Sequence, residues 1–458
     1  MAENLSVAAD AYALYLPALQ SGSAQRLLSD RKALRAKDFP KWLHVKDLNW
    51  LDPGNRYWHY RWCLASAGHM IDARDRNAIA HRHPDTVIMG DSGGYQIATG
   101  ALRDMAAATE LRKQPDAVME LWRASDVRDR IISWLDAHCT VAATIDMPIW
   151  VRHAKHESSP FHYFSEAQLI QATVENLEYI QRHRDKQTGC KFLNVLQGFS
   201  PTGDLRESIE SEDRWFDAVK AYPFEGWAFG SDVGWRGGLY RVMRRLLVLR
   251  DAGLLNPPRS WFHMLGLSQP VWAVCLTAMQ RGIRATVNPE FRISFDSASP
   301  YLMAGKYNQY SIMPQFGDDL RNWAIRSVAL PSDYAVANAA TTQPFPGSSP
   351  IATRLTLQDM NPRKGDRFVA RAIDDLTAEV LNNHNVYVYV KAMIAANEAV
   401  FSAQADADHE LVRAARMIEE IMTSPDGLQK LEQQAQALEN VIMRTKTTPT
   451  DSAGEDRE

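Results

Sequence analysis

The stretch from Val87 to Gln96 (VIMGDSGGYQ) places a carboxylate, Asp91, at the end of an apolar run and directly before two glycines. The apolar run predicts a buried strand, and the Gly-Gly pair predicts a tight turn after it. Asp91 would then stand at the tip of the strand, where a carboxylate can transfer protons. The same pattern also fits an aspartate that only caps the following helix.

Later segments repeat this arrangement, because several other apolar runs also end in a polar residue or a glycine. The six predicted strand ends are Asp91, Asp146, Gln197, Gly230, Gly266 and Asp296. In a barrel of alternating strands and helices, all of these ends meet on one face. Carboxylates that are crowded in a partly dry pocket raise one another's pKa, which suits general acid–base chemistry. Their convergence favours a functional site over six separate helix caps.

The elements that must position these residues follow a regular rhythm from residue 86 onward. Predicted strands cover residues 86–91, 140–146, 191–198, 226–232, 261–266 and 293–296. Predicted helices between them cover residues 114–138, 165–186, 204–221, 238–252 and 270–282. This alternation predicts an α/β protein with a parallel sheet. The number of units favours a TIM (β/α)8-type barrel with N-terminal additions and a C-terminal helical extension.

The first eighty residues follow a different pattern. Residues 11–41 are predicted as a basic helix, residues 42–48 as a first strand, and the aromatic-rich run 57–69 as a helix. The sequence predicts an N-terminal region (1–80), a barrel domain (81–330), a linker or wrap rich in Ala, Thr, Pro and Ser (331–366), a helical region (367–444) and a disordered polar tail (445–458).

The overall composition limits the class of protein. A net charge of −4 gives no global signal for nucleic acid, so any such binding must come from a local basic patch. Four scattered cysteines without a Cys-x-x-Cys pair predict reduced, buried thiols. The chain has neither a secretory leader pattern nor an apolar run long enough to span a bilayer, so we expect a soluble cytoplasmic protein.

The run DSGGYQ at residues 91–96 resembles the signature of the tRNA-guanine transglycosylases. Further similar motifs follow in the family's order: TIDMP (144–148), VLQG (195–198), AFGS (228–231), HMLG (263–266), QRGI (280–283) and FD (295–296). The resemblance covers about residues 85–300. It implies a TIM barrel and an enzyme that exchanges a guanine base of nucleic acid for a 7-deazaguanine.

The resemblance also assigns roles to individual residues. It makes Asp296 the nucleophile and Asp91 the general acid/base, in the manner of a retaining glycosidase. It implies a base-binding set of Ser92, Gly93, Gly94, Tyr95, Asp146, Gln197, Gly198, Gly230, Ser231, Leu265 and Gly266. In this set Tyr95 stacks on one face of the base, and the apolar side chain of the HMLG motif packs on the other.

Departures from the family pattern point to a particular branch. The tRNA enzymes carry a Cys-x-Cys-x-x-Cys…His zinc site after the nucleophile, whereas this chain has no cysteine after Cys275. We therefore expect no structural zinc and no other metal or cofactor. Residues 284–294 form an insertion, and Ser231 stands where the family has a glycine.

These departures resemble the DNA 7-deazaguanine transglycosylases, which are thought to place 7-cyano-7-deazaguanine (preQ0) into DNA with an ATPase partner. The expected partners are therefore nucleic acid, with DNA preferred over tRNA, a 7-deazaguanine and an ATPase, and no membrane. Two alternatives stay open: the same chemistry on tRNA, and a catalytically silent barrel that serves as a binding subunit.

Nucleic-acid contacts are less well defined by the sequence. Arg236, Arg241 and Arg245 lie in or just before the predicted helix 238–252, and Arg363 and Lys364 lie in a basic loop. These cations could face phosphates, or they could form ordinary helix and loop surface. Trp150 and Trp235 follow strand ends, where they could stack on flanking bases or pack against the rim.

Overall fold

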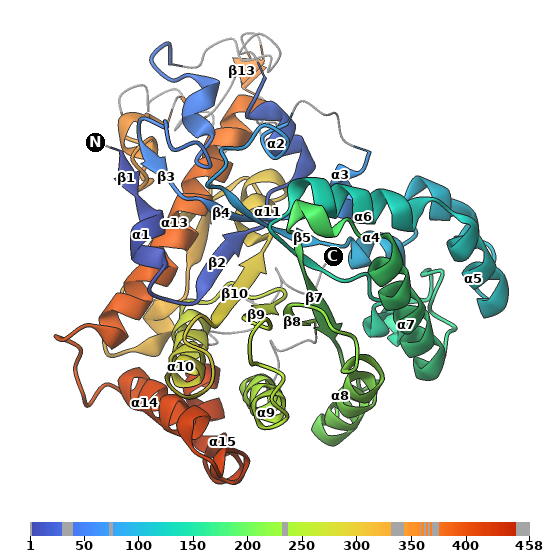
Figure 1. Ribbon diagram of the computed structural model, residues 1–458. Helices are drawn as coiled ribbons and strands as arrows, with labels where there is room; N and C mark the ends of the chain where they lie inside the picture. Colours follow the sequence, from blue (N-terminus) through green and yellow to red (C-terminus); the bar gives the residue numbers. More distant parts are fainter. Residues whose placement is uncertain are drawn as a thin grey trace.

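Eight parallel strands form a barrel-like sheet at the centre of the computed structural model (Figure 1). The structure describes residues 2–29, 40–72, 77–230, 237–330, 343–357, 359–360, 363–364, 367–368 and 375–445. The order in the sheet is β2-β10-β9-β8-β7-β6-β5-β4. The strands are β2 (Leu14–Pro17), β4 (Trp62–Ser66), β5 (Val87–Asp91), β6 (Val141–Ala143), β7 (Lys191–Leu196), β8 (Gly226–Phe229), β9 (Trp261–Met264) and β10 (Arg292–Ser297).

The sheet curls until its two edge strands approach each other. Ala18, just after β2, forms a parallel bridge with Leu64 of β4, and the N–H of Leu19 donates to the Leu64 carbonyl at 2.8 Å. The sheet is therefore nearly closed, which leaves few unpaired backbone groups at its edges. Apart from the ends of some strands, the strand residues are buried, as expected for parallel strands covered by helices.

Helices surround this sheet, and their order confirms the predicted alternation from residue 86 onward (Figure 1). Predicted helix 114–138 is two helices that are separated at Ser125 and Asp126. The helices from α3 to α11 are α3 (Ala67–Met70), α4 (Gly94–Ala98), α5 (Pro115–Ala124), α6 (Val127–His138), α7 (Glu166–His183), α8 (Leu205–Val219), α9 (Gly238–Asp251), α10 (Pro270–Thr286) and α11 (Ser299–Gly305).

The N-terminal region departs from three secondary-structure predictions. Residues 42–48, predicted as a strand, contain a 3-10 helix at Val45–Leu48. The aromatic-rich run 57–69, predicted as a helix, contains β3 (Trp58–His59) and barrel strand β4, because its aromatic residues pack well on a sheet. Segment 11–41, predicted as one basic helix, begins with barrel strand β2 and has only the short α2 (Ser21–Arg26), and its residues 30–39 lie outside the described ones.

The C-terminal region is helical, as predicted. Its helices are α13 (Asp375–Phe401), α14 (Glu410–Thr423) and α15 (Gly427–Arg444). Helix α13 packs against α10, α11 and β2, and most of its residues are buried. Its polar side chains find partners there: Asn383 accepts a hydrogen bond from the Trp58 indole at 3.1 Å, and the His384 ring contacts the Ser311 carbonyl at 2.9 Å.

Small elements complete the described part of the fold. They are β1 (Glu3–Asn4), α1 (Leu5–Ala9), the antiparallel pair β11 (Gln309–Ile312) and β12 (Arg326–Ala329), and the antiparallel pair β13 (Arg363–Lys364) and β14 (Arg367–Phe368). Residues 331–342 and several later positions of the predicted linker 331–366 lie outside the described residues, as does nearly all of the tail 445–458. None of the described helices combines the length and the apolar character needed to cross a membrane.

Candidate functional site

The carboxyl ends of the barrel strands bring the predicted carboxylates to one face. Asp91 is the last residue of β5, Asp296 lies near the end of β10, and Asp146 follows β6. Because neighbouring parallel strands end at the same edge, these side chains converge there. The pKa shifts agree with this placement: in addition to burial, the charge of Asp296 raises the pKa of Asp91, and the charge of Asp91 raises the pKa of Asp146.

Asp296 is held by groups from the neighbouring strand β9. It is 8% exposed, and the backbone N–H of Gly266 donates to its Oδ1 at 3.1 Å. Nε2 of His263 lies 3.3 Å from the same oxygen. Gly266 has φ +77°, which a side chain would strain, so a glycine suits the turn that aims this N–H at the carboxylate.

Asp91 is positioned by the tips of β4 and β5. Burial raises its pKa, the hydroxyl of Ser66 and the N–H of Gly93 (3.2 Å) oppose that rise, and the charge of Asp296 adds to it. The net effect is a raised pKa. A carboxyl group with a raised pKa holds its proton closer to neutral pH, which suits a general acid.

Asp146 and Gln197 form a buried pair beside Asp91. The Gln197 amide donates from Nε2 to Oδ2 of Asp146, while its Oε1 accepts the backbone N–H of Ile149 at 2.9 Å. Burial raises the pKa of Asp146 to about 7, and the charge of Asp91 adds to this rise. These contacts fix the orientation of the amide and leave a buried carboxyl group that can offer or accept a proton near neutral pH.

The glycines after Asp91 are needed for the backbone geometry of the turn. Gly93 has φ +86°, and a Cβ there would lie 2.6 Å from Cα of Gly68. A Cβ on Gly94 would lie 3.7 Å from Oδ1 of Asp146, so the turn borders the second carboxylate. The Ser92 hydroxyl is buried and finds no hydrogen-bond partner among the described residues.

Tyr95 lies at the rim of this face. It is 40% exposed, and its ring stacks on that of Trp150 at 5.9 Å between centroids. The ring of Trp150 in turn contacts that of His156 at 4.5 Å. The contacts of Trp150 fit packing at the rim, while the exposed part of Tyr95 stays accessible to a planar ligand.

Gly230 and Leu265 lie against Gln197. A Cβ on Gly230 would lie 3.3 Å from Cδ1 of Leu265 and 3.7 Å from Cγ of Gln197. The backbone at Gly230 therefore approaches the Asp146–Gln197 pair closely.

Some of the predicted site residues cannot be placed. Ser231, Trp235 and Arg236 lie outside the described residues, as do the side chains of Arg363 and Lys364, whose backbone forms β13.

Gly198 has a packing role in the structure. A Cβ at this position would lie 2.1 Å from Cγ of Glu212 and 2.7 Å from the carbonyl oxygen of Ser208. We expect Gly198→Ala to lower the free energy of unfolding by about 1–3 kcal/mol, because the backbone of α8 cannot yield easily. Urea unfolding measures this change, and Gly317→Ala, at a glycine with open space around it, is the control. An unchanged unfolding midpoint for Gly198→Ala would contradict the packing role.

Two of the predicted phosphate-contacting arginines are buried in ion pairs. Arg241 is 7% exposed and donates from Nε to Glu212 at 2.6 Å, and Arg245 is 0% exposed and donates to Asp213 at 2.8 Å. These contacts join α9 to α8. The structure thus corrects this part of the sequence interpretation, and we exclude both residues from any nucleic-acid surface.

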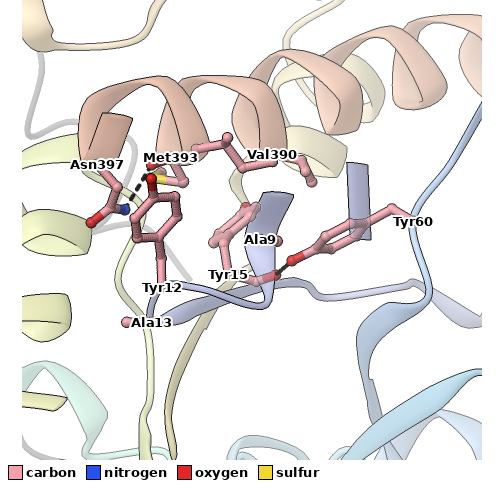
Figure 2. Close-up of a pocket in the computed structure, with 9 residues that line it drawn as sticks. Ala9, Tyr12, Ala13, Tyr15, Tyr60, Val390, Met393 and Asn397 are labelled. Carbon is pink, nitrogen blue, oxygen red and sulfur yellow. Dashed lines mark hydrogen bonds between the residues drawn. The ribbon is translucent and has the colours of Figure 1, made fainter. Parts of the chain in front are cut away.

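The small cavity in Figure 2 lies away from the strand-end face. It has a volume of about 10 Å³, enough at most for one water molecule. It lies between β2, Tyr60 and helix α13, where the Tyr60 hydroxyl donates to the Tyr15 carbonyl at 2.6 Å. This cavity is a packing defect rather than a ligand site.

Three residues near the carboxylates were not singled out from the sequence. Ser66 contacts Asp91, Gly68 makes room for the turn at Gly93, and His263 contacts Asp296. The alternation of side chains along β9 and β10 would have placed His263 on the face of Asp296, had the register been known. No group of three or more metal-ligating side chains occurs among the described residues.

The fold and the site define a class: a barrel-like parallel α/β protein with three carboxyl groups and a buried amide at the carboxyl ends of its strands. No family model matches the chain, and no curated protein matches it either.

Proposed function

We propose that this protein is a nucleic-acid guanine transglycosylase that exchanges guanine in DNA for preQ0 or a related 7-deazaguanine. Its fold would be a TIM (β/α)8 barrel, which carries active sites at the carboxyl ends of its strands. The observation that carries the proposal is the grouping of Asp91, Asp146 and Asp296 at those ends, with Gln197 bonded to Asp146.

The chemistry divides between two carboxyl groups. A carboxylate oxygen of Asp296 forms a bond to C1′ while the bond from C1′ to N9 of guanine breaks. Protonated Asp91 gives its proton to the departing guanine, whose N9 keeps the electron pair. The incoming base then returns a proton to Asp91, its N9 bonds to C1′, and the ester bond to Asp296 breaks. The two steps retain the configuration at C1′.

The remaining residues would read and hold the base. Asp146 and Gln197 offer acceptor and donor atoms to the edge of a purine-like ring, and the backbone at Gly230 closes one side. Tyr95 is exposed enough to stack on one face, with Leu265 against the other. The target nucleotide must leave the duplex, or be single-stranded, to reach a site at the strand ends.

The preference for DNA over tRNA rests on the sequence. The Cys-rich zinc motif of the tRNA enzymes is missing from residues 276–458. The described C-terminal helices pack on the barrel through α10 and α9. The proposal extends to an ATPase partner and to a cytoplasmic location, both on the resemblance alone.

The decisive experiment is a base-exchange assay with isotope-labelled guanine or preQ0. Bulk tRNA, double-stranded DNA and single-stranded DNA are offered in parallel, then digested for nucleoside mass spectrometry. We expect label in DNA, and more in single-stranded than in double-stranded DNA because unstacking is already complete. Label in tRNA alone would select the tRNA reaction, and label in neither, even with an ATPase partner added, would favour the silent binding subunit.

A further inference from the structure

His263 lies next to Asp296, and the proposed reaction gives it no role. It lies in β9, is fully buried, and approaches the carboxylate with Nε2 at 3.3 Å from Oδ1. That contact is within ion-pair range but is not aligned as a hydrogen bond, since Nε2 has no hydrogen-bond partner among the described residues. A buried ring nitrogen without an aligned partner beside a carboxylate calls for an explanation.

The opposite ring nitrogen is held by a chain of polar atoms. The Trp261 indole N–H donates to Oγ of Ser294 at 2.8 Å, and the same Oγ lies 2.8 Å from Nδ1 of His263. An indole can only donate, so the serine oxygen accepts from Trp261 and can give its own proton to Nδ1 of His263. In that arrangement a neutral His263 carries its proton on Nε2, which is the nitrogen that faces Asp296.

The strand register explains why these four side chains meet. Ser294 of β10 pairs with His263 of β9, and alternation along β10 places Ser294 and Asp296 on one face. On the other side of β9, His263 pairs with Ala228 and Trp261 pairs with Gly226. A Cβ on Gly226 would lie 2.3 Å from the Trp261 carbonyl oxygen, so a glycine at this position lets β8 and β9 approach closely.

We propose that His263 is a positioning residue for Asp296: the Trp261–Ser294 relay directs its Nε2–H to the Asp296 carboxylate and fixes the oxygen for attack on C1′. This inference rests on the proposed function for the reaction that it serves. The contact between the ring and the carboxylate can be tested without that function. Alignment into a full hydrogen bond is expected when substrate closes the site, because catalytic hydrogen bonds often tighten only in the complex.

The titratable groups that the structure brings near Asp296 within the described residues are His263 from β9, Asp91 from β5 and Tyr15 from β2. Tyr15 bonds to Ser297 through its hydroxyl at 3.1 Å, so it does not compete for the carboxylate. His263 is therefore the side chain in this set whose ring nitrogen faces an oxygen of the Asp296 carboxylate.

The kinetic test measures the rate at which the covalent adduct forms in a single turnover. His263→Leu should slow adduct formation by about 10- to 100-fold, the effect of one lost hydrogen bond to a charged group. His263→Gln, which keeps a donor at a similar reach, should recover much of the rate.

Two further variants keep the test decisive. Ser294→Ala removes the partner of Nδ1, keeps the ring, and should give a weaker effect in the same direction. His384→Gln removes another fully buried histidine, on α13, and should leave the rate unchanged. A loss of rate in His263→Leu that glutamine does not recover would overturn the positioning role.

Nitrogen NMR of the histidine rings separates this inference from the proposed function. We expect His263 in the free protein as the Nε2–H tautomer, with ring shifts that change in Asp296→Asn but not in Asp217→Asn. An Nδ1–H tautomer, or shifts that ignore Asp296→Asn, would overturn the inference even if base exchange occurs. The expected shifts in a protein that exchanges no base would reject the proposed function and leave the pairing of His263 with Asp296 standing.

Discussion

Asp296→Asn is expected to abolish both base exchange and the covalent adduct, with a loss of at least about 10⁴-fold in rate. An amide of the same shape keeps the hydrogen bond from the Gly266 N–H (3.1 Å) but has no carboxylate oxygen to form the ester with C1′. The measurement is a single-turnover reaction with single-stranded DNA, followed by denaturing electrophoresis for the protein–DNA adduct. Because the fold should tolerate the isosteric change, an unaltered unfolding curve is part of the expected result.

The matched comparison is Asp91→Asn, which removes the proton donor and leaves the nucleophile in place. It should slow turnover by about 10²- to 10⁴-fold, the usual contribution of general acid–base catalysis. An adduct that does form should persist, because no carboxylate remains to deprotonate the incoming base. Asp217→Asn, an exposed change on α8 with its partner Lys220, controls for the substitution itself. Full activity in Asp296→Asn would show that the nucleophile lies elsewhere.

The fold was predictable wherever the strand pattern was strong. Strands β5 to β10 were predicted to within a few residues because each is a short apolar run bounded by turn residues, and helices α7 to α10 between them were predicted to within a few residues as well. Strand β2 was missed because it lies within segment 11–41, whose leucines and basic residues predict a single helix. Strand β4 was missed because it lies inside an aromatic-rich run that shows no strand periodicity, and its parallel pairing with β5 fixes its place.

The site residues also fall into two groups: those that a local sequence pattern reveals, and those that only contacts between strands reveal. Asp91, Asp146, Gln197 and Asp296 could be found because each follows an apolar run in the sequence. His263 could not, since its partners lie on β10 and only the register joins them.

For the arginines of α9 the sequence suggested a possible functional role that the structure does not support. A basic helix face and a buried ion-paired face have the same pattern of residues. The carboxylates that bury Arg241 and Arg245 come from α8, which no feature of the α9 sequence could reveal.

Asp146→Asn is expected to stabilise the protein above neutral pH while it impairs recognition of the base. The ordinary pKa of an aspartate is 3.8, and burial followed by the charge of Asp91 raises that of Asp146 to about 7. Between these values the unfolded chain has lost its proton and the folded protein still holds it, so the free energy of unfolding falls as pH rises. Below about pH 4 both states are protonated, and the residue has no pH-dependent effect there.

The asparagine variant removes this loss, because an amide does not ionise and can still accept the Gln197 amide N–H. We expect a gain of order 1–4 kcal/mol at pH 8 and little change at pH 4, measured by urea unfolding at both values.

Asp213→Asn should show the opposite dependence on pH: it should lower the free energy of unfolding at neutral pH and change it little in acid. Burial would raise the pKa of Asp213, but hydrogen bonds from Arg244 and Arg245 lower it overall, so its contribution to stability is present at neutral pH and lost in acid.

A destabilised Asp146→Asn at pH 8 would mean that the ionised carboxylate is well satisfied in the folded protein. Stabilisation at pH 8 with loss of exchange would instead indicate that this buried carboxyl group is kept for binding the base at a cost to stability.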